Sequence, residues 1–224
     1  MTHLEGALIA DPSAPRKISN FGARAPPGVG PFGRVAFGAR DPTARGDAIA
    51  SPSVGLESYK SQTISEYAEA AGIRAEATFT NNPNGTIQWP FAVGVHIGDR
   101  FGYRDCAGCS SDHHGQDFNP GYGAEIQAIA DGVVSQSTDN GGSLGTVMMI
   151  DHMIDGQVVT SVYAHMISGS RRFEVGDTVK VGDVVGQTGN TGMSTGPHLH
   201  FEIRLGGVNG TWTDPLEWLY ANTN

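Results

Sequence analysis

The sequence predicts a mainly β protein: an antiparallel β-sheet or sandwich domain with short helices and a disordered N-terminal tail. Three observations lead to this prediction. Glycine is abundant, at 32 of 224 residues, and charged residues make up only 17%, which suits a turn-rich β protein better than a helical one. From Ile87 onward, short apolar runs alternate with glycine turns. Before residue 58, proline is concentrated and no helical or strand period persists.

The predicted tail covers residues 1–57. It holds seven of the 12 prolines, with glycine and arginine interspersed. Such a segment cannot bury enough apolar surface to offset the entropy that it would lose on ordering. Residues 1–50 carry six basic and four acidic side chains, whereas the whole chain has a net charge of −9. The tail is therefore more basic than the rest of the chain and could contact an anionic polymer, but the simpler interpretation is that it is a linker.

Residues 58–84 are expected to form a short helix and a linker. The helix falls within 58–74, with Ser61 or Thr63 as its N-cap and Gly72 at its end. The sequence Asn-Pro-Asn-Gly at 82–85 is a turn signal and closes this segment.

The strands of residues 85–224 are predicted from short apolar runs that end at turn residues. Glu125–Ala130, Asp131-Gly132 and Val133-Val134 indicate a strand, a tight turn and a second strand. The other predicted strands are 87–89, 146–152, 157–165, two short strands near 175–183, and a strand that contains 198–203. A helical turn is predicted at 214–219, with Asp214 as its N-cap and Pro215 at its first helical position.

Charge and hydropathy exclude several classes of protein. A net charge of −9 argues against a nucleic-acid surface, so no nucleic-acid partner is expected. No run approaches the roughly 18 apolar residues that span a membrane, so no transmembrane segment is expected. Residues 1–5 lack the basic start of a secretory signal, and no apolar stretch follows. Export would then require upstream sequence, follow an unusual route, or not occur.

Cys106 and Cys109 are the two cysteines of the chain and form a C-x-x-C pair. Their number excludes a four-cysteine zinc site, but a mixed cysteine and histidine site stays open. The pair can be a local disulfide, a redox pair or two free thiols. A redox motif more often opens a helix after a strand, and no such pattern surrounds this pair.

Two histidines, His198 and His200, stand two residues apart in a run of strand-forming residues. The alternation of a strand places both imidazoles on one face and directs Leu199 and Phe201 to the other face, toward a core. Such a face can build a metal or proton-transfer site, although a surface strand that carries histidine by chance is the alternative. Glu202 shares this face, either as a partner of a histidine or as a solvated carboxylate.

A second set of ligand-type residues is His113 and Asp117, which are four apart and can lie on one side of an element. Gly115 argues against a helix there. With one more imidazole, these residues would make a three-ligand zinc site that leaves a fourth position for water; several other divalent metals suit the same ligands. His165 ends a predicted strand, where a lone histidine is more often structural than catalytic.

In order, the motifs His-x-x-x-Asp, Tyr-x-His and Gly-Pro-His-Leu-His-Phe-Glu resemble those of the lysostaphin-type (LytM-like) zinc metallopeptidases, which cut peptide cross-links in bacterial peptidoglycan. The resemblance runs from about Trp89 to Leu219 and leaves residues 1–80 outside. It also includes the runs Phe101-Gly102-Tyr103-Arg104, Asp131-Gly132-Val133-Val134 and 186–192.

The resemblance implies that residues 85–224 form a zinc metallopeptidase domain, a peptidoglycan endopeptidase with a Zn²⁺ cofactor. It assigns the metal ligands to His113, Asp117 and His200. Bacterial peptidoglycan peptides would be the partner, and we expect a monomer in an extracellular or cell-envelope location. For an enzyme that acts on the wall, a disulfide between the two cysteines is the favoured state.

The resemblance also assigns His165 and His198 as catalytic histidines beside the metal, without settling which of them accepts a proton from water. Tyr103 falls where such enzymes often have a tyrosine that stabilises the transition state, although its spacing to His113 is longer than a short loop would give. The remaining histidines match no ligand position and are expected to be structural: His96, His114 and His152.

Two other functions stay open at this point. The chain could be a non-catalytic family member that binds the wall or activates another hydrolase, although degenerate members typically lack one or more ligands. It could also be a C-x-x-C redox protein, which would require a low thiol pKa. Members of the family differ between glycine-rich bridges and stem-peptide cross-links, and the sequence does not identify the bond that is cut.

Overall fold

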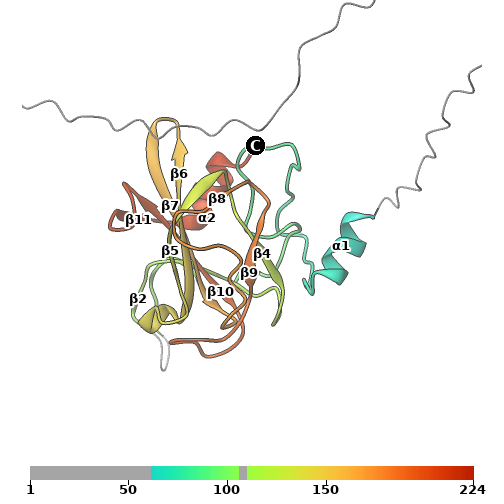
Figure 1. The fold of residues 1–224 in the computed structure, drawn as a ribbon. Helices are drawn as coiled ribbons and strands as arrows, with labels where there is room; N and C mark the ends of the chain where they lie inside the picture. The colour runs from blue at the N-terminus through green and yellow to red at the C-terminus, as the bar shows by residue number, and fades with distance from the viewer. Residues whose placement is uncertain (1–61, 106–109) are drawn as a thin grey trace, which may run out of the picture. The chain divides into compact units, whose positions relative to one another are not determined.

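The computed structural model describes residues 62–105 and 110–224. The predicted tail at 1–57 and the Cys106/Cys109 pair lie outside the described residues. Within them the protein is mainly β, with antiparallel strand pairs and two short α-helices (Figure 1), as the sequence predicts. No helix in these residues has the length and hydropathy needed to cross a membrane.

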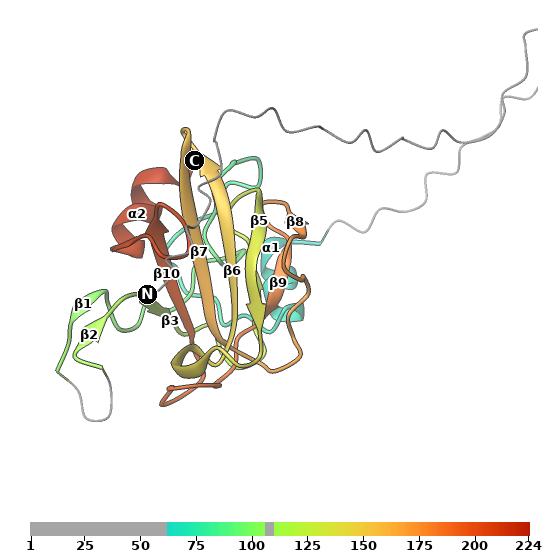
Figure 2. The ribbon, with the colours of Figure 1, turned by 60° about the vertical axis from the view of Figure 1, so that its left-hand side comes forward.

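A seven-stranded antiparallel sheet is the centre of the fold (Figure 2). Its strand order is β11–β10–β7–β6–β5–β8, and β3 pairs with β10 beside this path. The strands are β3 (Gln116–Phe118), β5 (Gly132–Thr138), β6 (Thr146–Ile154), β7 (Gln157–Met166), β8 (Thr178–Val179), β10 (Leu199–Leu205) and β11 (Thr211–Thr213). The predicted histidine strand is β10, and it pairs with three strands: β7, β3 and β11.

Two small antiparallel sheets and three helical segments complete the described residues. One small sheet pairs β1 with β2, and the other pairs β4 with β9. The bounds are β1 (Gly102–Tyr103), β2 (Asp112–His113), β4 (Glu125–Gln127), β9 (Val184–Gln187), α1 (Ile64–Ala70), α2 (Pro215–Asn222) and the 3₁₀ turn η1 (Gly142–Leu144).

The two strands predicted on either side of Asp131-Gly132 are present as β4 and β5, but they do not pair with each other across a tight turn. β4 pairs with β9 and β5 pairs with β6 and β8, so the two strands that flank this dipeptide belong to different sheets. Asp131 instead binds the segment after β8: its carboxylate accepts from the backbone of Val181 at 2.9 Å and from Lys180 Nζ at 2.8 Å. The predicted strand at 87–89 is absent, because Ile87 forms only an isolated bridge with Ala130.

Both helices begin where the sequence places an N-cap. Thr63 and Glu66 form a capping box at the start of α1, which satisfies two otherwise unpaired N–H groups. The helix ends at Ala70, and Gly72 follows with φ +69°, so α1 lies within the predicted 58–74 and stops just before Gly72, as predicted. Asp214 caps α2 by accepting from the N–H groups of Leu216 and Glu217.

The core lies under one face of β10. Leu199, Phe201 and Ile203 are fully buried, as the predicted alternation requires. Phe201 packs against Phe118 of β3 and Tyr163 of β7, with ring centroids 6.2 and 5.4 Å apart. Burial of each such side chain stabilises the fold by about 1.5–3 kcal/mol. This packing holds the opposite face of β10, which carries the histidine, in a fixed position.

Candidate metal centre

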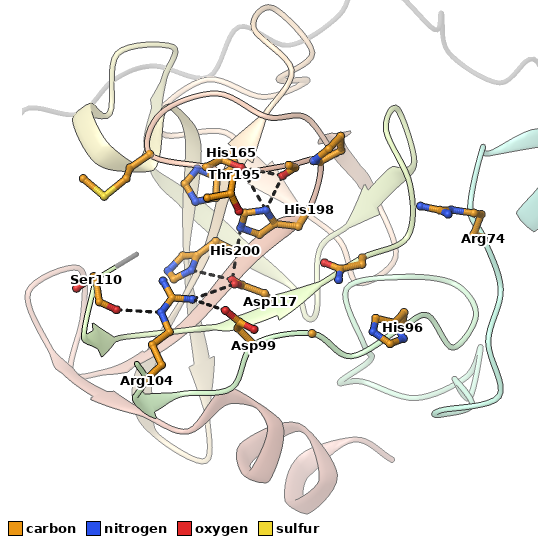
Figure 3. Close-up of a pocket in the computed structure, with 16 residues that line it drawn as sticks. Arg74, His96, Asp99, Arg104, Ser110, Asp117, His165, Thr195, His198 and His200 are labelled. Carbon is orange, nitrogen blue, oxygen red and sulfur yellow. Dashed lines mark hydrogen bonds and ion pairs between the residues drawn. The ribbon is translucent and has the colours of Figure 1, made fainter. Parts of the chain in front are cut away.

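Three side-chain atoms converge on one point beside β10: Nε2 of His113, Oδ1 of Asp117 and Nδ1 of His200. His113 Nε2 lies 3.1 Å from Asp117 Oδ1 and 2.9 Å from His200 Nδ1. Asp117 Oδ1 lies 3.2 Å from His200 Nδ1. All three side chains are buried, and together they form a group that could hold a metal ion. Figure 3 shows the side chains of Asp117 and His200 pointing toward each other, with a dashed line that marks their contact.

Strand pairing brings these residues together from distant parts of the sequence. β3 pairs with β10 so that Asp117 lies opposite His200, and opposite residues of an antiparallel pair share a face. His113 ends β2, just before the turn into β3. Gly115 permits this close approach, since a Cβ there would lie 2.7 Å from the His200 ring and 2.6 Å from Phe201 O.

The hydrogen-bond partners of the two imidazoles show where their protons lie. His113 Nδ1 lies 2.7 Å from the carbonyl of Arg100, and a carbonyl only accepts, so Nδ1 donates and Nε2 of the neutral ring offers a lone pair. His200 Nε2 lies 3.0 Å from a carboxylate oxygen of Glu202, so Nδ1 of the neutral ring offers a lone pair. With Asp117 Oδ1, three electron-pair donors therefore face one another.

A divalent cation fits this arrangement. Ligands at about 2.0–2.1 Å from a tetrahedral ion lie about 3.3 Å from one another, close to the spacing of the three atoms here. Two imidazoles and one carboxylate leave the fourth tetrahedral position open. The donor set therefore suits an ion that also binds a water molecule.

Glu202 is the partner of His200, as its place on the strand allows. Its second oxygen, Oε2, accepts from Arg204 Nε at 2.8 Å and from Trp212 Nε1 at 3.0 Å. Burial alone would raise the pKa of Glu202, but His200 and Arg204 outweigh it and hold that pKa below its usual value. The carboxylate is thus ionised and fully paired, which fixes the orientation of His200.

The electrostatics of the centre favour an ionised Asp117. Burial by itself would raise the pKa of this carboxyl group, but its contacts with His113 and His200 outweigh the burial and hold the pKa well below the usual range. For His200, burial would lower the pKa, and the carboxylates of Asp117 and Glu202 raise it instead. Negative charge therefore surrounds the point where the three atoms converge.

His165 and His198 lie beside this centre. The centroid of the His165 ring is 4.8 Å from that of His198 and 5.6 Å from that of His200, and Nε2 of His198 lies 3.6 Å from Asp117 Oδ1. His198 and His200 both line the cavity (Figure 3), in agreement with the predicted shared face. Burial, followed by repulsion from His198 and His200, lowers the pKa of His165 to about 4.

A β-bulge positions His165. Between Thr146↔Met166 and Met148↔Tyr163, β7 has one residue more than β6, and such bulges redirect side chains. His165 has φ +59°, a left-handed conformation that costs a non-glycine residue about 1 kcal/mol or more. Thr191 supports it, because its carbonyl accepts from His165 Nδ1 at 2.7 Å and its hydroxyl donates to Met166 O.

The cavity beside the centre has a volume of about 550 Å³. Asp117, His165, His198 and His200 line its inner part, and the segment 193–197 forms one wall. Figure 3 shows Arg74 and His96 farther from the centre, on the opposite side from Arg104 and Ser110. The cavity is large enough to admit a peptide segment beside the candidate metal centre.

Tyr103 is not brought to this centre. Its side chain is 83% exposed, and it does not line the cavity. The register of β1 and β2 explains the difference: Gly102 pairs with buried His113, and Tyr103 pairs with exposed Asp112, so Tyr103 shares the outward face. The next residue, Arg104, lines the cavity instead. Sequence reasoning missed it, although Arg104 ends the motif that contains Tyr103.

The remaining histidines have structural contacts. His114 pairs with Asp112 at 3.0 Å and stacks on Trp212, with ring centroids 4.0 Å apart. His96 pairs at the surface with Glu76 at 3.0 Å, although it also lines the outer cavity. His152 is buried away from the centre.

Comparison with known proteins identifies the family of this domain. Residues 111–215 match the family model described as Peptidase family M23. The chain carries a peptidase family M23 domain. Over 154 residues it is 32% identical to the glycyl-glycine endopeptidase ALE-1 of Staphylococcus capitis, an alignment that covers 67% of this chain and 38% of that protein.

Two further likenesses agree with the M23 assignment. Over 95 residues the chain is 39% identical to the DD-carboxypeptidase/endopeptidase Mpg of Neisseria meningitidis, covering 42% of this chain and 20% of that protein. The structure of the catalytic domain of the antimicrobial peptidase lysostaphin from Staphylococcus simulans matches with a TM-score of 0.51 and 28% identity, covering 56% of this chain and 92% of that domain. The chain thus spans between 20% and 38% of the length of these two full-length relatives.

Proposed function

We propose that this protein is a zinc-dependent endopeptidase that hydrolyses peptide cross-links or bridges of bacterial peptidoglycan. The observation that carries the proposal is the convergence of three possible ligand atoms, from His113, Asp117 and His200, beside two further histidines in one cavity. In the proposal these three residues are the metal ligands, and His165 and His198 are the catalytic residues. The catalytic domain spans residues 85–224, after the helix and linker at 58–84.

The choice of zinc rests on the donor set. Two imidazole nitrogens and one carboxylate oxygen, with one open tetrahedral position, are the ligands of many catalytic zinc sites. A zinc ion held there would polarise the substrate carbonyl and lower the pKa of a bound water toward neutrality. His113 and His200 would hold the ion as neutral rings, and Asp117 would supply one negative charge.

The two other histidines would move protons. His165 donates its Nδ1 proton to Thr191 O at 2.7 Å, and His198 donates its Nδ1 proton to Gly196 O at 2.8 Å. Each neutral ring therefore keeps an unprotonated Nε2. Such a nitrogen can accept a proton from water and later return it to the leaving amine. The two carbonyls fix this tautomer because they accept but never donate.

The names of the relatives support the substrate class. One is a glycyl-glycine endopeptidase and another a DD-carboxypeptidase/endopeptidase, so both cut peptide bonds. We therefore propose peptidoglycan peptides as the partner of this domain, an extracellular or cell-envelope location, and action as a monomer.

The test is mass spectrometry of purified peptidoglycan digested with the wild type and with His198→Ala. Two substrates, one with glycine bridges and one with direct stem-peptide cross-links, identify the bond that is cut. We expect the wild type to release peptides with a new amino terminus, a chelator to stop the release, and added zinc to restore it. His198→Ala should bind zinc and release no peptides.

Two results would contradict the proposal. A zinc-loaded wild type that releases nothing from either substrate would point to a non-catalytic role at the wall. Equal release by the wild type and His198→Ala would remove this histidine from the reaction. His96→Ala is the matched control, because this histidine lines the outer cavity but pairs with Glu76 at the surface.

A further inference from the structure

Arg104 lies directly against the candidate metal centre. It follows β1, and its side chain is 22% exposed at the cavity wall. One nitrogen, Nη1, donates to Asp99 Oδ2 at 3.0 Å and to Asp117 Oδ2 at 3.4 Å. Nε donates to the carbonyl of Ser110 at 3.0 Å. Figure 3 shows these contacts converging on the guanidinium group below His200.

These contacts divide the two oxygens of Asp117 between two tasks. Oδ1 faces His113 and His200, whereas Oδ2 faces Arg104. The guanidinium group is therefore held at a fixed place beside the centre by Asp99, Ser110 and Asp117. A side chain fixed in this way loses little further entropy when it binds a ligand.

The contacts described above do not use all the N–H donors of the Arg104 side chain. A guanidinium group has five N–H donors, and the contacts above involve Nε and Nη1. Within residues 62–105 and 110–224, Nη2 has no hydrogen-bond partner. It can therefore donate to a ligand in the cavity that Arg104 lines.

Apart from the proposed zinc ion, the side chains of the centre do not supply a hydrogen-bond donor for the substrate oxygen. When water adds to a peptide carbonyl, the electron pair of the C=O bond moves to oxygen, and hydrogen-bond donors or cations stabilise the charge. His165 and His198 already donate their Nδ1 protons to backbone carbonyls, so their neutral rings present lone pairs. Of the two arginines among the described lining residues, only Arg104 has an ion pair or hydrogen bond with the centre; Arg74 has none.

We propose that Arg104 donates a hydrogen bond from its guanidinium group to the reacting carbonyl oxygen of the substrate, and so stabilises the transition state, the role that the family resemblance implies for Tyr103. This inference rests on the proposed peptidase function. Arg104 is then a catalytic residue, and Tyr103 on the outward face of the same strand pair is not. Lysine at this position would keep the charge but lose the fork that also binds Asp99 and Ser110.

Inorganic phosphate is a suitable probe, because it is a tetrahedral oxyanion whose binding does not depend on which peptide is cut. Its affinity is measured by calorimetry on the zinc-loaded wild type, Arg104→Gln, Arg104→Lys and Tyr103→Phe. A charge-assisted hydrogen bond contributes about 1.5–3 kcal/mol, so Arg104→Gln should weaken phosphate binding roughly 10- to 100-fold. Arg104→Lys should fall between this variant and the wild type, and Tyr103→Phe should match the wild type.

Arg172→Gln is the matched control for the change in charge. Arg172 also pairs with a carboxylate, Glu125, at 2.9 Å, but it does not line the cavity. Its substitution should change phosphate affinity less than about twofold, since exposed charges are screened by solvent and salt. In peptidoglycan hydrolysis, Arg104→Gln should lower kcat about 10²- to 10³-fold, with a smaller change in KM.

Zinc affinity separates this role from an indirect one through Asp117. In competition with a chromophoric chelator, Arg104→Gln should bind zinc within about threefold of the wild type, well short of the 10–100-fold loss typical of an outer-shell ligand partner. A loss of zinc affinity as large as the loss of phosphate affinity would overturn the proposal, because Arg104 would then act by positioning Asp117.

Other outcomes are equally decisive. The proposed role of Arg104 would be overturned if Arg104→Gln bound phosphate as tightly as the wild type does. It would also be overturned if Tyr103→Phe lost more phosphate affinity than Arg104→Gln. A wild type that binds zinc and phosphate but cleaves no peptidoglycan would overturn the proposed function and leave the phosphate comparison intact. A wild type that takes up no zinc would overturn both.

Discussion

Nε2 of His200 lies 3.0 Å from Oε1 of Glu202, two residues further along β10. Residues i and i+2 of a strand share a face, so the sequence itself delivers a carboxylate to this imidazole. The contact decides which nitrogen of His200 carries the proton, and therefore which nitrogen faces His113 and Asp117. A short stretch of one strand thus sets both a candidate ligand and its orientation.

Glu202→Ala should lower zinc affinity about 10- to 100-fold, the range typical of outer-shell partners. The reason is that His200 loses the acceptor that fixes its tautomer. Glu202→Gln keeps an acceptor oxygen and should lose less. Chelator competition measures both variants, and circular dichroism checks the fold, since Arg204 loses its partner. Glu217→Gln, on the surface of α2, is the control. If Glu202→Ala bound zinc as tightly as the wild type, the prediction would be contradicted.

His113→Ala should reduce zinc affinity more than about 100-fold, a larger effect than the loss of an outer-shell partner. His114→Ala provides a close comparison, because it removes an imidazole from the adjacent residue. That imidazole is 39% exposed and contacts Asp112 and Trp212, so its removal should change zinc affinity only a few-fold. Equal losses in the two variants would show that His113 is not a ligand. The measurement is again competition with a chelator.

His165→Gly should be more stable than His165→Ala by about 1 kcal/mol, because glycine adopts φ +59° without the penalty that a Cβ brings. Urea unfolding of the metal-free protein measures the difference. At Gln136, within β5 and without a positive φ, glycine should instead be less stable than alanine by about 0.5–1 kcal/mol. The same sign at both positions would contradict a strained backbone at His165.

The stability of the protein should fall below about pH 6.5 through His152. Burial lowers the pKa of this histidine from 6.5, and its ring is held by Asp131 O at 3.0 Å and Ser161 Oγ at 2.7 Å. The folded state therefore binds fewer protons than the unfolded state just below that pH, so stability is full above it and is lost as the pH falls toward the folded-state pKa.

His152→Gln removes this titration. Urea unfolding of the metal-free wild type and variant at about pH 7.5 and pH 5 measures the effect. The wild type should lose more stability between the two values than His152→Gln does. Parallel losses would show that other groups, such as the carboxylates, account for the acid sensitivity.

Two Asp-Gly dipeptides show how far local sequence determines this fold. At Asp155-Gly156 the hairpin of β6 and β7 forms, and both residues have positive φ, +50° and +77°, as a type I′ turn requires. At Asp131-Gly132 the same dipeptide joins strands of two different sheets. The partner of β4 is β9, far along the chain, and such pairing depends on long-range packing that a dipeptide does not encode.

The sequence by itself determined the features that follow from the two-residue alternation of side chains along a β-strand. The alternation of β10 placed His200 and Glu202 on one face and Phe201 in the core. Only the tertiary structure decided that Asp117 lies opposite His200, and that Arg104 rather than Tyr103 lines the cavity. The physical reason is pairing register: a shift of one residue between β1 and β2 exchanges the inward and outward faces, and that register is set by contacts between segments distant in the sequence.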